Sequence, residues 1–266
     1  MIETESVAAA IRTALLTGEP TAKVMATRKV ARKWRLGRLA FAFDTAMPER
    51  PARPKQPLLL RPRDMPRRGK GGSERGRTAL LHALAHIEFT AIDLALDMAG
   101  RFGGAEGPKF VADWLSVAAD EALHFALLER RLRAFGSHYG ALPAHDGLWE
   151  SAQITRHDVL ARLAIVPMVL EARGLDVTPV TVERFRIAGD EATARVLERI
   201  YSDEIRHVRF GTAHFARVCE RRALPPVDTW RSLVAAHFTG SIKPPFNDSA
   251  RLTAGLPREF YAGIAL

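Results

Sequence analysis

The chain has 266 residues, of which 47% are apolar, and it carries a formal net charge of +9. A chain of this length and composition can bury a sizeable core. Its single cysteine, Cys219, excludes an internal disulfide bond and any site that needs several thiolates, such as an Fe–S cluster. The acidic start of the chain predicts no secretory signal, and no apolar run is expected to span a membrane, so we expect a reducing cytoplasm.

The positive charge makes nucleic acid a candidate partner of the protein. Arginine-rich surfaces are also common without such a partner, and none of the usual nucleic-acid-binding motifs occurs in the sequence. A solvated basic surface is therefore the favoured interpretation, and nucleic acid stays open as the alternative.

The first 77 residues predict two helices followed by an extended segment. Residues 3–17 and 22–45 have helical composition, and Thr21 is positioned to cap the second helix. Residues 46–77 form a basic strap, because five prolines and ten Lys or Arg residues lie between positions 49 and 78. Prolines at this density exclude a regular helix or a central strand.

Residues 78–222 predict four long helices. The first is expected to stop at Gly103-Gly104, and the second runs from Pro108 to Gly136. The third is predicted to kink at Pro167, and a turn with a short helix capped by Thr178 follows it. Asp190 is expected to cap the fourth helix.

This order predicts one all-α domain over residues 1–266. Its centre is a four-helix bundle with a crossover connection, which the two N-terminal helices (1–45) precede. Residues 223–266 are expected to form one short helix and then an irregular, proline-containing extension that packs on the bundle.

An internal repeat is the strongest pattern in the sequence. The motif D-E-x-x-H occurs as Asp120–His124 and again as Asp203–His207, 83 residues later. Glu88 and Glu171 each lie 33 residues before the glutamate of one motif. Each of these glutamates is followed at the same distance by an aliphatic-Asp pair, which makes a chance match a poor explanation.

The repeat has the chemistry of a metal site. Residues three apart lie on one helical face, so each motif presents a carboxylate and an imidazole together. Glu88 and Glu171 lie in strongly apolar stretches, where a buried carboxylate needs a compensating cation. Four carboxylates and two imidazoles balance two divalent ions and suit iron, and manganese fits the same donors. The predicted ligands are Glu88, Glu121, His124, Glu171, Glu204 and His207.

This pattern resembles the ferritin-like di-iron carboxylate superfamily, in which two helices give one Glu each and two give Glu-x-x-His. The resemblance covers residues 78–215, and the wider chain is similar to an uncharacterised bacterial branch of ferritin-like proteins. It implies that Glu121 and Glu204 bridge the two metal ions. It also implies that Asp120 and Asp203 support the ligand histidines by hydrogen bonding.

Other candidate residues have a simpler interpretation. His82 and His86 are expected to be core histidines or supports behind the ligands, and Tyr201 a packing residue. Asp93 and Asp176 are expected to make hydrogen bonds at helix ends rather than to bind metal.

The leading functional hypothesis is a di-iron oxidoreductase that activates O₂ to oxidise or hydroxylate an unidentified small molecule, with a separate reductase as electron donor. No catalytic residue beyond the metal ligands is identified. The alternatives are a ferroxidase or iron store, a tRNA-modifying hydroxylase, and a non-catalytic helical interaction protein. A monomer or dimer would argue against a storage cage.

Overall fold

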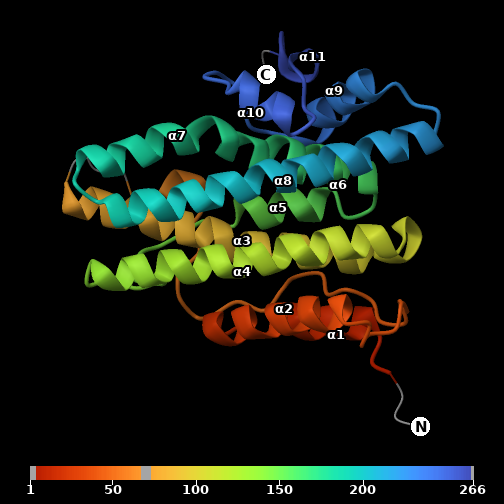
Figure 1. Cartoon of the computed structure of the whole chain (residues 1–266), viewed down its shortest axis with the longest axis horizontal. Coiled ribbons are helices and arrows are strands. Elements are labelled where there is room, and N and C mark those ends of the chain that lie inside the picture. Colours follow the sequence, from red (N-terminus) through yellow and green to blue (C-terminus); the bar gives the residue numbers. More distant parts are fainter. Residues whose placement is uncertain (1–3, 67–72, 265–266) are drawn as a thin grey trace. The chain divides into compact units, whose positions relative to one another are not determined.

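The computed structural model describes residues 4–66 and 73–264, and within these ranges all regular structure is helical. This confirms the predicted all-α class. The chain forms two compact units, Met1–Trp149 and Glu150–Leu266 (Figure 1). Helix α5, Gly147–Ile154, spans the boundary between them.

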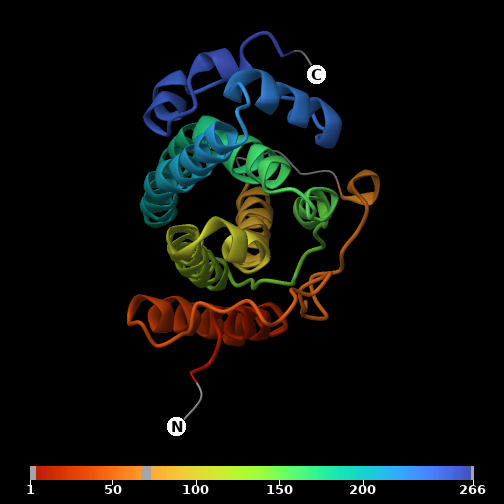
Figure 2. The same cartoon turned by 90° about the vertical axis from the view of Figure 1, so that its right-hand side faces the viewer.

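The first unit is built around two long antiparallel helices, which a single residue connects. Gly107 ends α3 and begins α4, and its φ of 94° lies in the left-handed region that glycine favours. Two shorter helices pack on this pair, α1 on α3 and α2 on α4 (Figure 2). The bounds of the helices in this unit are α1 Val7–Leu15, α2 Pro20–Arg35, η1 Pro62–Asp64, α3 Glu74–Glu106 and α4 Pro108–Ala134.

The predicted second helix was right in kind and wrong at both ends. Glu19 caps α2, because its carboxylate accepts the amide hydrogens of Thr21 and Ala22, and Pro20 takes the first helical position. The helix ends at Arg35 rather than at residue 45. The chain then runs back beside the start of α1, where the amide of Val7 donates to the carbonyl of Ala40.

The prediction that Gly103-Gly104 stops the first of the four long helices was wrong. Helix α3 continues through both glycines to Glu106. A Cβ atom at Gly103 would lie 2.5 Å from Val111 and 2.8 Å from the ring of Phe43, so the glycine makes room for close packing. Pro108 at the first turn of α4 and Gly136 after its end, with φ of 66°, confirm the other boundaries.

Helix α3 is also long and apolar enough to cross a bilayer, which corrects the expectation that no stretch reaches this length and hydropathy. Its most apolar 18-residue window has a mean hydropathy of 1.4, and 72% of that window is buried inside the protein. Such burial is typical of the core helix of a globular domain, so we assign α3 to the core.

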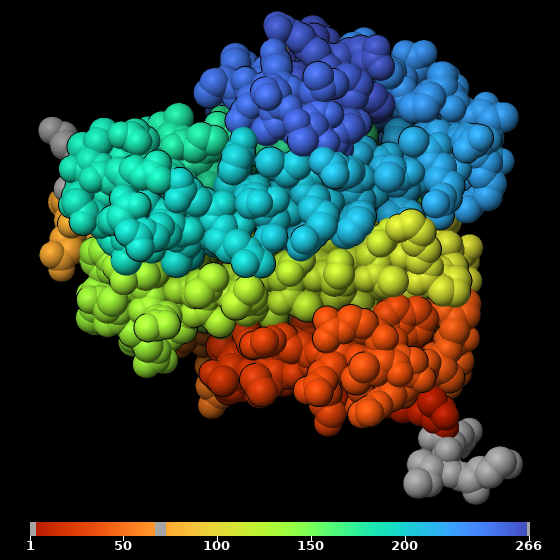
Figure 3. Space-filling model, viewed as in Figure 1, coloured from red at the N-terminus to blue at the C-terminus, as the bar shows by residue number. Residues whose placement is uncertain are grey.

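The second unit repeats the antiparallel pair with α7 and α8, which pack together (Figure 1). The C-terminal helices lie over this pair, where α9 contacts α6 and α10 contacts α7 and α8. The space-filling view in Figure 3 shows the blue C-terminal segment covering α7 and α8. The bounds in this unit are α6 Val159–Ile165, η2 Val166–Glu171, α7 Ala172–Ile187, α8 Glu191–Arg221, α9 Pro226–His237, α10 Asp248–Thr253 and α11 Arg258–Tyr261.

Two prolines shape the helix run that precedes α8. Pro167 lies in η2, a π-helical segment, which confirms that the α-helix is interrupted there. The predicted turn and new helix at Thr178-Pro179 are wrong, because Pro179 lies inside the continuous helix α7. Pro179 cannot donate to the carbonyl of Leu175, and the side-chain amide of Asn247 donates to that carbonyl instead, at 3.2 Å. Asp190 caps α8 as predicted.

Candidate metal centre

Three predicted ligands meet inside the first unit. Glu88 lies on α3, and Glu121 and His124 lie one turn apart on α4. The i, i+3 spacing places the last two on one helical face, and the antiparallel packing of α3 on α4 brings Glu88 opposite to them. All three side chains are buried, with exposed fractions of 6%, 1% and 0%.

The imidazole of His124 is the centre of this group. Its Nδ1 atom lies 3.2 Å from Oε2 of Glu88 and 3.3 Å from Oε2 of Glu121. One ligand atom from each of the three residues lies within 4.8 Å of the others. Two carboxylate oxygens and one imidazole nitrogen therefore converge on one small volume.

The electrostatics of this group favour a cation. Burial, and next the like charge of Glu121, raises the pKa of Glu88 well above its usual range, although His124 acts in the opposite direction. Two buried carboxylates at this separation cannot both ionise at low cost unless a positive charge lies between them. Two carboxylates and an imidazole are donors that suit a divalent first-row metal ion.

The second unit holds the matching residues on its own helices. Glu204 and His207 lie one turn apart on α8, with Nδ1 of His207 3.6 Å from Oε1 of Glu204, and both are buried. Glu171 is the last residue of η2, which packs on α8, and it is half-buried. The Glu-x-x-His pair is thus preformed, whereas Glu171 lies where the π-helix returns to α-helix.

The two aspartates that precede the motifs differ in their surroundings. Asp203 is buried and forms ion pairs with Arg199 at 2.7 Å and Arg206 at 3.5 Å. Asp120 is half-buried on α4, one turn before His124. Their predicted support of the ligand histidines stays a prediction.

Asp93 does not bond a helix end, so the expectation for it was wrong. It is fully buried in the middle of α3, where its carboxylate pairs with the ammonium of Lys23 on α2. Arg53 forms a second ion pair with it, at 2.7 Å. Burial raises the pKa of Asp93 and lowers that of Lys23, so each group depends on the other to stay charged.

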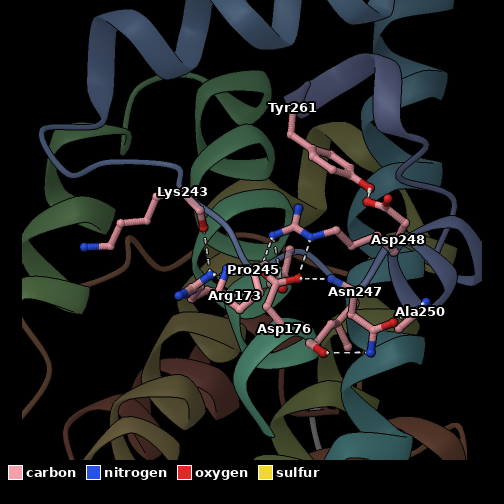
Figure 4. Close-up of polar contacts among 11 residues, drawn as sticks. Arg173, Asp176, Lys243, Pro245, Asn247, Asp248, Ala250 and Tyr261 are labelled. Atoms are coloured by element: carbon pink, nitrogen blue, oxygen red, sulfur yellow. Dashed lines mark hydrogen bonds and ion pairs between the residues drawn. The ribbon is translucent and has the colours of Figure 1, made fainter. Parts of the chain in front are cut away.

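Asp176, at the equivalent position of the repeat, also has partners from outside the helix pair, and one of them lies at a helix end, as expected, because Asn247 is the N-cap of α10 (Figure 4). Its two carboxylate oxygens accept from Nε and Nη2 of Arg251 on α10, at 2.8 and 2.7 Å. The backbone amide of Asn247 donates to the same carboxylate, at 3.0 Å. The guanidinium of Arg251 also lies over the rings of Phe246 and Tyr261, at 5.1 and 4.5 Å from their centroids.

The side chain of Arg173 forms hydrogen bonds with the backbone of the neighbouring tail segment. Its Nη1 atom donates to the carbonyls of Lys243 and Pro245, at 2.9 and 3.1 Å (Figure 4). The side-chain amide of Asn247 also donates to the hydroxyl of Tyr201. Tyr201 therefore has a polar partner as well as the expected packing role.

The two histidines near the start of α3 are core residues, as predicted. Nε2 of His82 accepts the backbone amides of Gly140 and Leu142, at 2.9 and 3.4 Å. His86 lies between the hydroxyl of Tyr139 and the carbonyl of His145. Burial lowers the pKa of His82 and of His86 to about 4, so both stay neutral near pH 7.

Sequence reasoning missed the partners of the two repeat-related aspartates. The identical offset of Asp93 and Asp176 after the first glutamate of each half was visible. The cations that bind them, Lys23 and Arg251, lie 70 and 75 residues away in segments without an internal repeat.

Comparison with known proteins gives a family without an assigned activity. A curated protein of Haemophilus influenzae, named "Uncharacterized protein", is 44% identical over 208 residues, which cover 76% of this chain and 72% of that protein. No solved structure matches the chain. A family model described as "Protein of unknown function (DUF455)" matches residues 16–262, and the chain belongs to this family.

Proposed function

We propose that this protein is a dinuclear metal protein with a ferritin-like arrangement of its helix pairs, and that it acts as an O₂-activating di-iron oxidoreductase in the cytoplasm. The six proposed ligands are Glu88, Glu121, His124, Glu171, Glu204 and His207. Iron is the proposed metal because the donors combine carboxylate oxygens with imidazole nitrogens, and manganese suits the same set.

One observation carries the proposal. Glu88, Glu121 and His124 are buried together, and the pKa of Glu88 is raised well above its usual range by burial and by a second carboxylate. A purely structural cluster would gain stability if these groups were apolar. The sequence repeat supports extension of the site to the second unit, where Glu204 and His207 have the same spacing.

Two bound iron ions would supply the electrons and the Lewis acidity that reaction with O₂ requires. The protein residues have separate tasks. His124 and His207 would give neutral nitrogen donors, and the four carboxylates would offset the positive charge. The buried walls of the site exclude bulk water, which strengthens every electrostatic interaction inside. Binding of a cation at Glu88 requires loss of its proton.

A cavity in the first unit supports a small-molecule substrate rather than storage alone. It has a volume of about 820 Å³ and lies along the first turns of α3. His82 of this helix and His145, from the segment before α5, are among the residues that line it. Its size is within the range of sites that bind small molecules. His82 lies six residues before Glu88, which corresponds to about 9 Å along the helix axis.

The test is metal content and oxygen uptake. Protein loaded with Fe(II) without oxygen is expected to hold two iron atoms per chain by elemental analysis, and to consume O₂ when air is admitted. Glu88→Gln and Glu204→Gln are each expected to lose at least half of the metal. Glu183→Gln, at an exposed position of α7, is the matched control and is expected to retain it.

Unchanged metal content in both ligand variants would refute the proposed site. Metal binding without any O₂ consumption would refute the oxidoreductase and leave a metal-binding protein. Rapid release of Fe(III) after one round of O₂ uptake would indicate a ferroxidase instead.

A further inference from the structure

Helix α2 and the turn after it carry an unusual excess of positive charge. Residues 20–43 contain seven Lys or Arg residues and no Asp or Glu. Two of the seven are neutralised, since Lys23 pairs with buried Asp93 and Lys33 pairs with Glu5 at 2.6 Å. The other five side chains are exposed and form no ion pair with any residue that the structure describes. They are Arg28, Lys29, Arg32, Arg35 and Arg38.

Four of these cations line a groove between α2 and α4 in the first unit. The groove has a volume of about 1410 Å³, and Arg28, Lys29, Arg32 and Arg35 line its α2 side. Its α4 side includes the small side chains of Ala112, Ser116 and Ala119 as well as the larger ones of Leu115 and Leu123. The space-filling view shows α2 alongside α4 in this unit (Figure 3).

The acidic groups near the groove are too few to cancel this charge. Asp120 lines the α4 side, and Asp113 is paired with Lys109, which also lines the groove, at 2.8 Å. Among the described residues, four cations that form no ion pair therefore line the groove together with Asp120 and the Asp113–Lys109 pair. A positive potential concentrated in a concave surface attracts polyanions.

The geometry of the cations fits a repeating anion. Arg28, Arg32 and Arg35 follow the i, i+4, i+7 spacing and share one helical face over about 10 Å. That length corresponds to about three nucleotides of a stacked strand, at about 3.4 Å each. Trp34 also lines the groove and is half-buried, with its ring tilted against that of Phe41 at 6.3 Å between centroids, and an aromatic ring that lines a groove can stack on a base.

A membrane surface fits less well. A helix that lies on a membrane inserts its apolar face into the lipid. The apolar side of α2, with Val24 and Val30, is buried within the first unit. The exposed side is concave together with α4, which suits a strand better than a plane.

We propose that the groove between α2 and α4 binds a single strand of nucleic acid through its phosphates, with Trp34 stacking on a base. This inference is independent of the metal centre. None of its residues is a proposed metal ligand, although Asp120, a proposed support of a histidine, lines the groove.

The test is binding of a fluorescein-labelled 15-nucleotide oligouridine to the full chain by fluorescence anisotropy. Four phosphate contacts predict a slope of about −2.8 when the logarithm of the association constant is plotted against that of the salt concentration. The triple variant Arg28→Gln/Arg32→Gln/Arg35→Gln is expected to bind at least tenfold more weakly at low salt. The slope for this variant is expected to become shallower, at about −0.7, because one of the four phosphate contacts remains.

A matched triple variant controls for net charge. Arg130→Gln/Arg184→Gln/Arg217→Gln removes the same charge from exposed positions outside the groove and is expected to bind within about twofold of wild type. Trp34 gives a second readout, because Trp114, Trp149 and Trp230 are at most 1% exposed. Binding is expected to quench tryptophan fluorescence, and Trp34→Phe is expected to remove the quenching.

Several outcomes would overturn the proposal. They are no saturable binding at low salt, equal losses in the two triple variants, or tighter binding to vesicles that contain phosphatidylglycerol. Equal binding of oligoglutamate, without quenching of Trp34, would indicate an acidic protein segment instead. Binding of oligothymidine as well as oligouridine would support recognition through phosphate.

Discussion

The two units share a pattern of buried charge but differ in what it holds. In each, an aspartate five residues after the first glutamate of the repeat is buried in a long helix and binds a cation from outside the helix pair. Asp93 binds Lys23 of the N-terminal helices, and Asp176 binds Arg251 of the C-terminal tail. The same position of the repeat thus binds two segments that are unrelated in sequence, the N-terminal helices in one unit and the C-terminal tail in the other.

The surroundings of the first glutamate of the repeat, Glu88 or Glu171, also differ between the two units. Helix α3 is uninterrupted around Glu88, and His82 and His86 lie on the preceding turns. The positions 83 residues later are Ile165 and Val169, in a stretch that becomes π-helical before Glu171. The first unit thus has a regular helix with polar neighbours around its proposed ligand, and the second has apolar neighbours and an irregular backbone.

The largest expected effect comes from breaking the anchor of the first unit. Asp93→Asn is expected to lower the free energy of unfolding by about 3–5 kcal/mol, because it leaves the buried ammonium of Lys23 without a counter-ion. Urea unfolding followed by circular dichroism measures this change. Lys33→Ala, which removes a surface ion pair with Glu5, is expected to cost less than about 1 kcal/mol. Similar costs for both variants would show that burial of the pair does not matter.

Breaking the anchor of the second unit is expected to cost about 3 kcal/mol, since Arg251→Met keeps much of the apolar packing but leaves buried Asp176 with only the longer ion pair to Arg173, at 3.4 Å. Limited proteolysis is expected to cut the chain after residue 237 much faster than in wild type. Arg258→Met removes an exposed pair with Asp248 and is the control, with unchanged proteolysis expected. A protected tail in the Arg251 variant would contradict the anchoring role.

Acid is expected to distinguish the units, because the first contains His82 where the second has Ile165. The pKa of His82 is about 4 in the folded protein, below its ordinary value of 6.5, so the folded state binds fewer protons between these values. The stability that neutral His82 gives is therefore present above pH 6.5 and lost as the pH falls toward 4. The loss is roughly 2 kcal/mol between pH 7 and pH 4.5.

Urea unfolding at several pH values tests this dependence. His82→Gln keeps a neutral acceptor for the amides of Gly140 and Leu142, and its stability is expected to fall less steeply with acid. His157→Gln, at an exposed position, is expected to follow the wild-type curve. Parallel curves for wild type and His82→Gln would be the contrary result.

The smallest predicted effect concerns the proline in α7. Asn247→Ala removes the bond to Tyr201 and the cap of α10 as well as the donor to the carbonyl of Leu175, and the part of its cost that belongs to this carbonyl is expected to be about 1 kcal/mol. In a Pro179→Ala background the backbone amide can donate to that carbonyl, so the same substitution is expected to cost less. A double-mutant cycle measures the difference, and strict additivity would contradict the compensation.

The sequence predicted those features that depend on neighbours along the chain. Pro108 at a first helical turn, Asp190 as a cap and the pairs Glu121/His124 and Glu204/His207 follow from spacings of a few residues. The meeting of Glu88 with His124 also followed, because the repeat indicated that helices at one offset carry the ligands.

The errors have a common physical cause, which is a partner far away in the sequence. Gly103 was interpreted as a helix stop because the ring of Phe43 that packs on it could not be foreseen. Pro179 by itself predicts a helix start, whereas α7 continues through it and Asn247 bonds the carbonyl of Leu175 that Pro179 leaves without its amide donor. Local helix propensity is overridden where a side chain from a distant segment packs on the residue or forms the hydrogen bond that the residue itself cannot form.

The one-residue turn at Gly107 has a consequence for the order of folding. It makes α3 and α4 a helical hairpin whose contacts begin between neighbouring turns, so the hairpin can close with little loss of chain entropy. Lys23 reaches Asp93 only across 70 residues, which is a costlier closure. We expect amide protons of α3 and α4 to gain protection from hydrogen exchange before those of α2 during refolding.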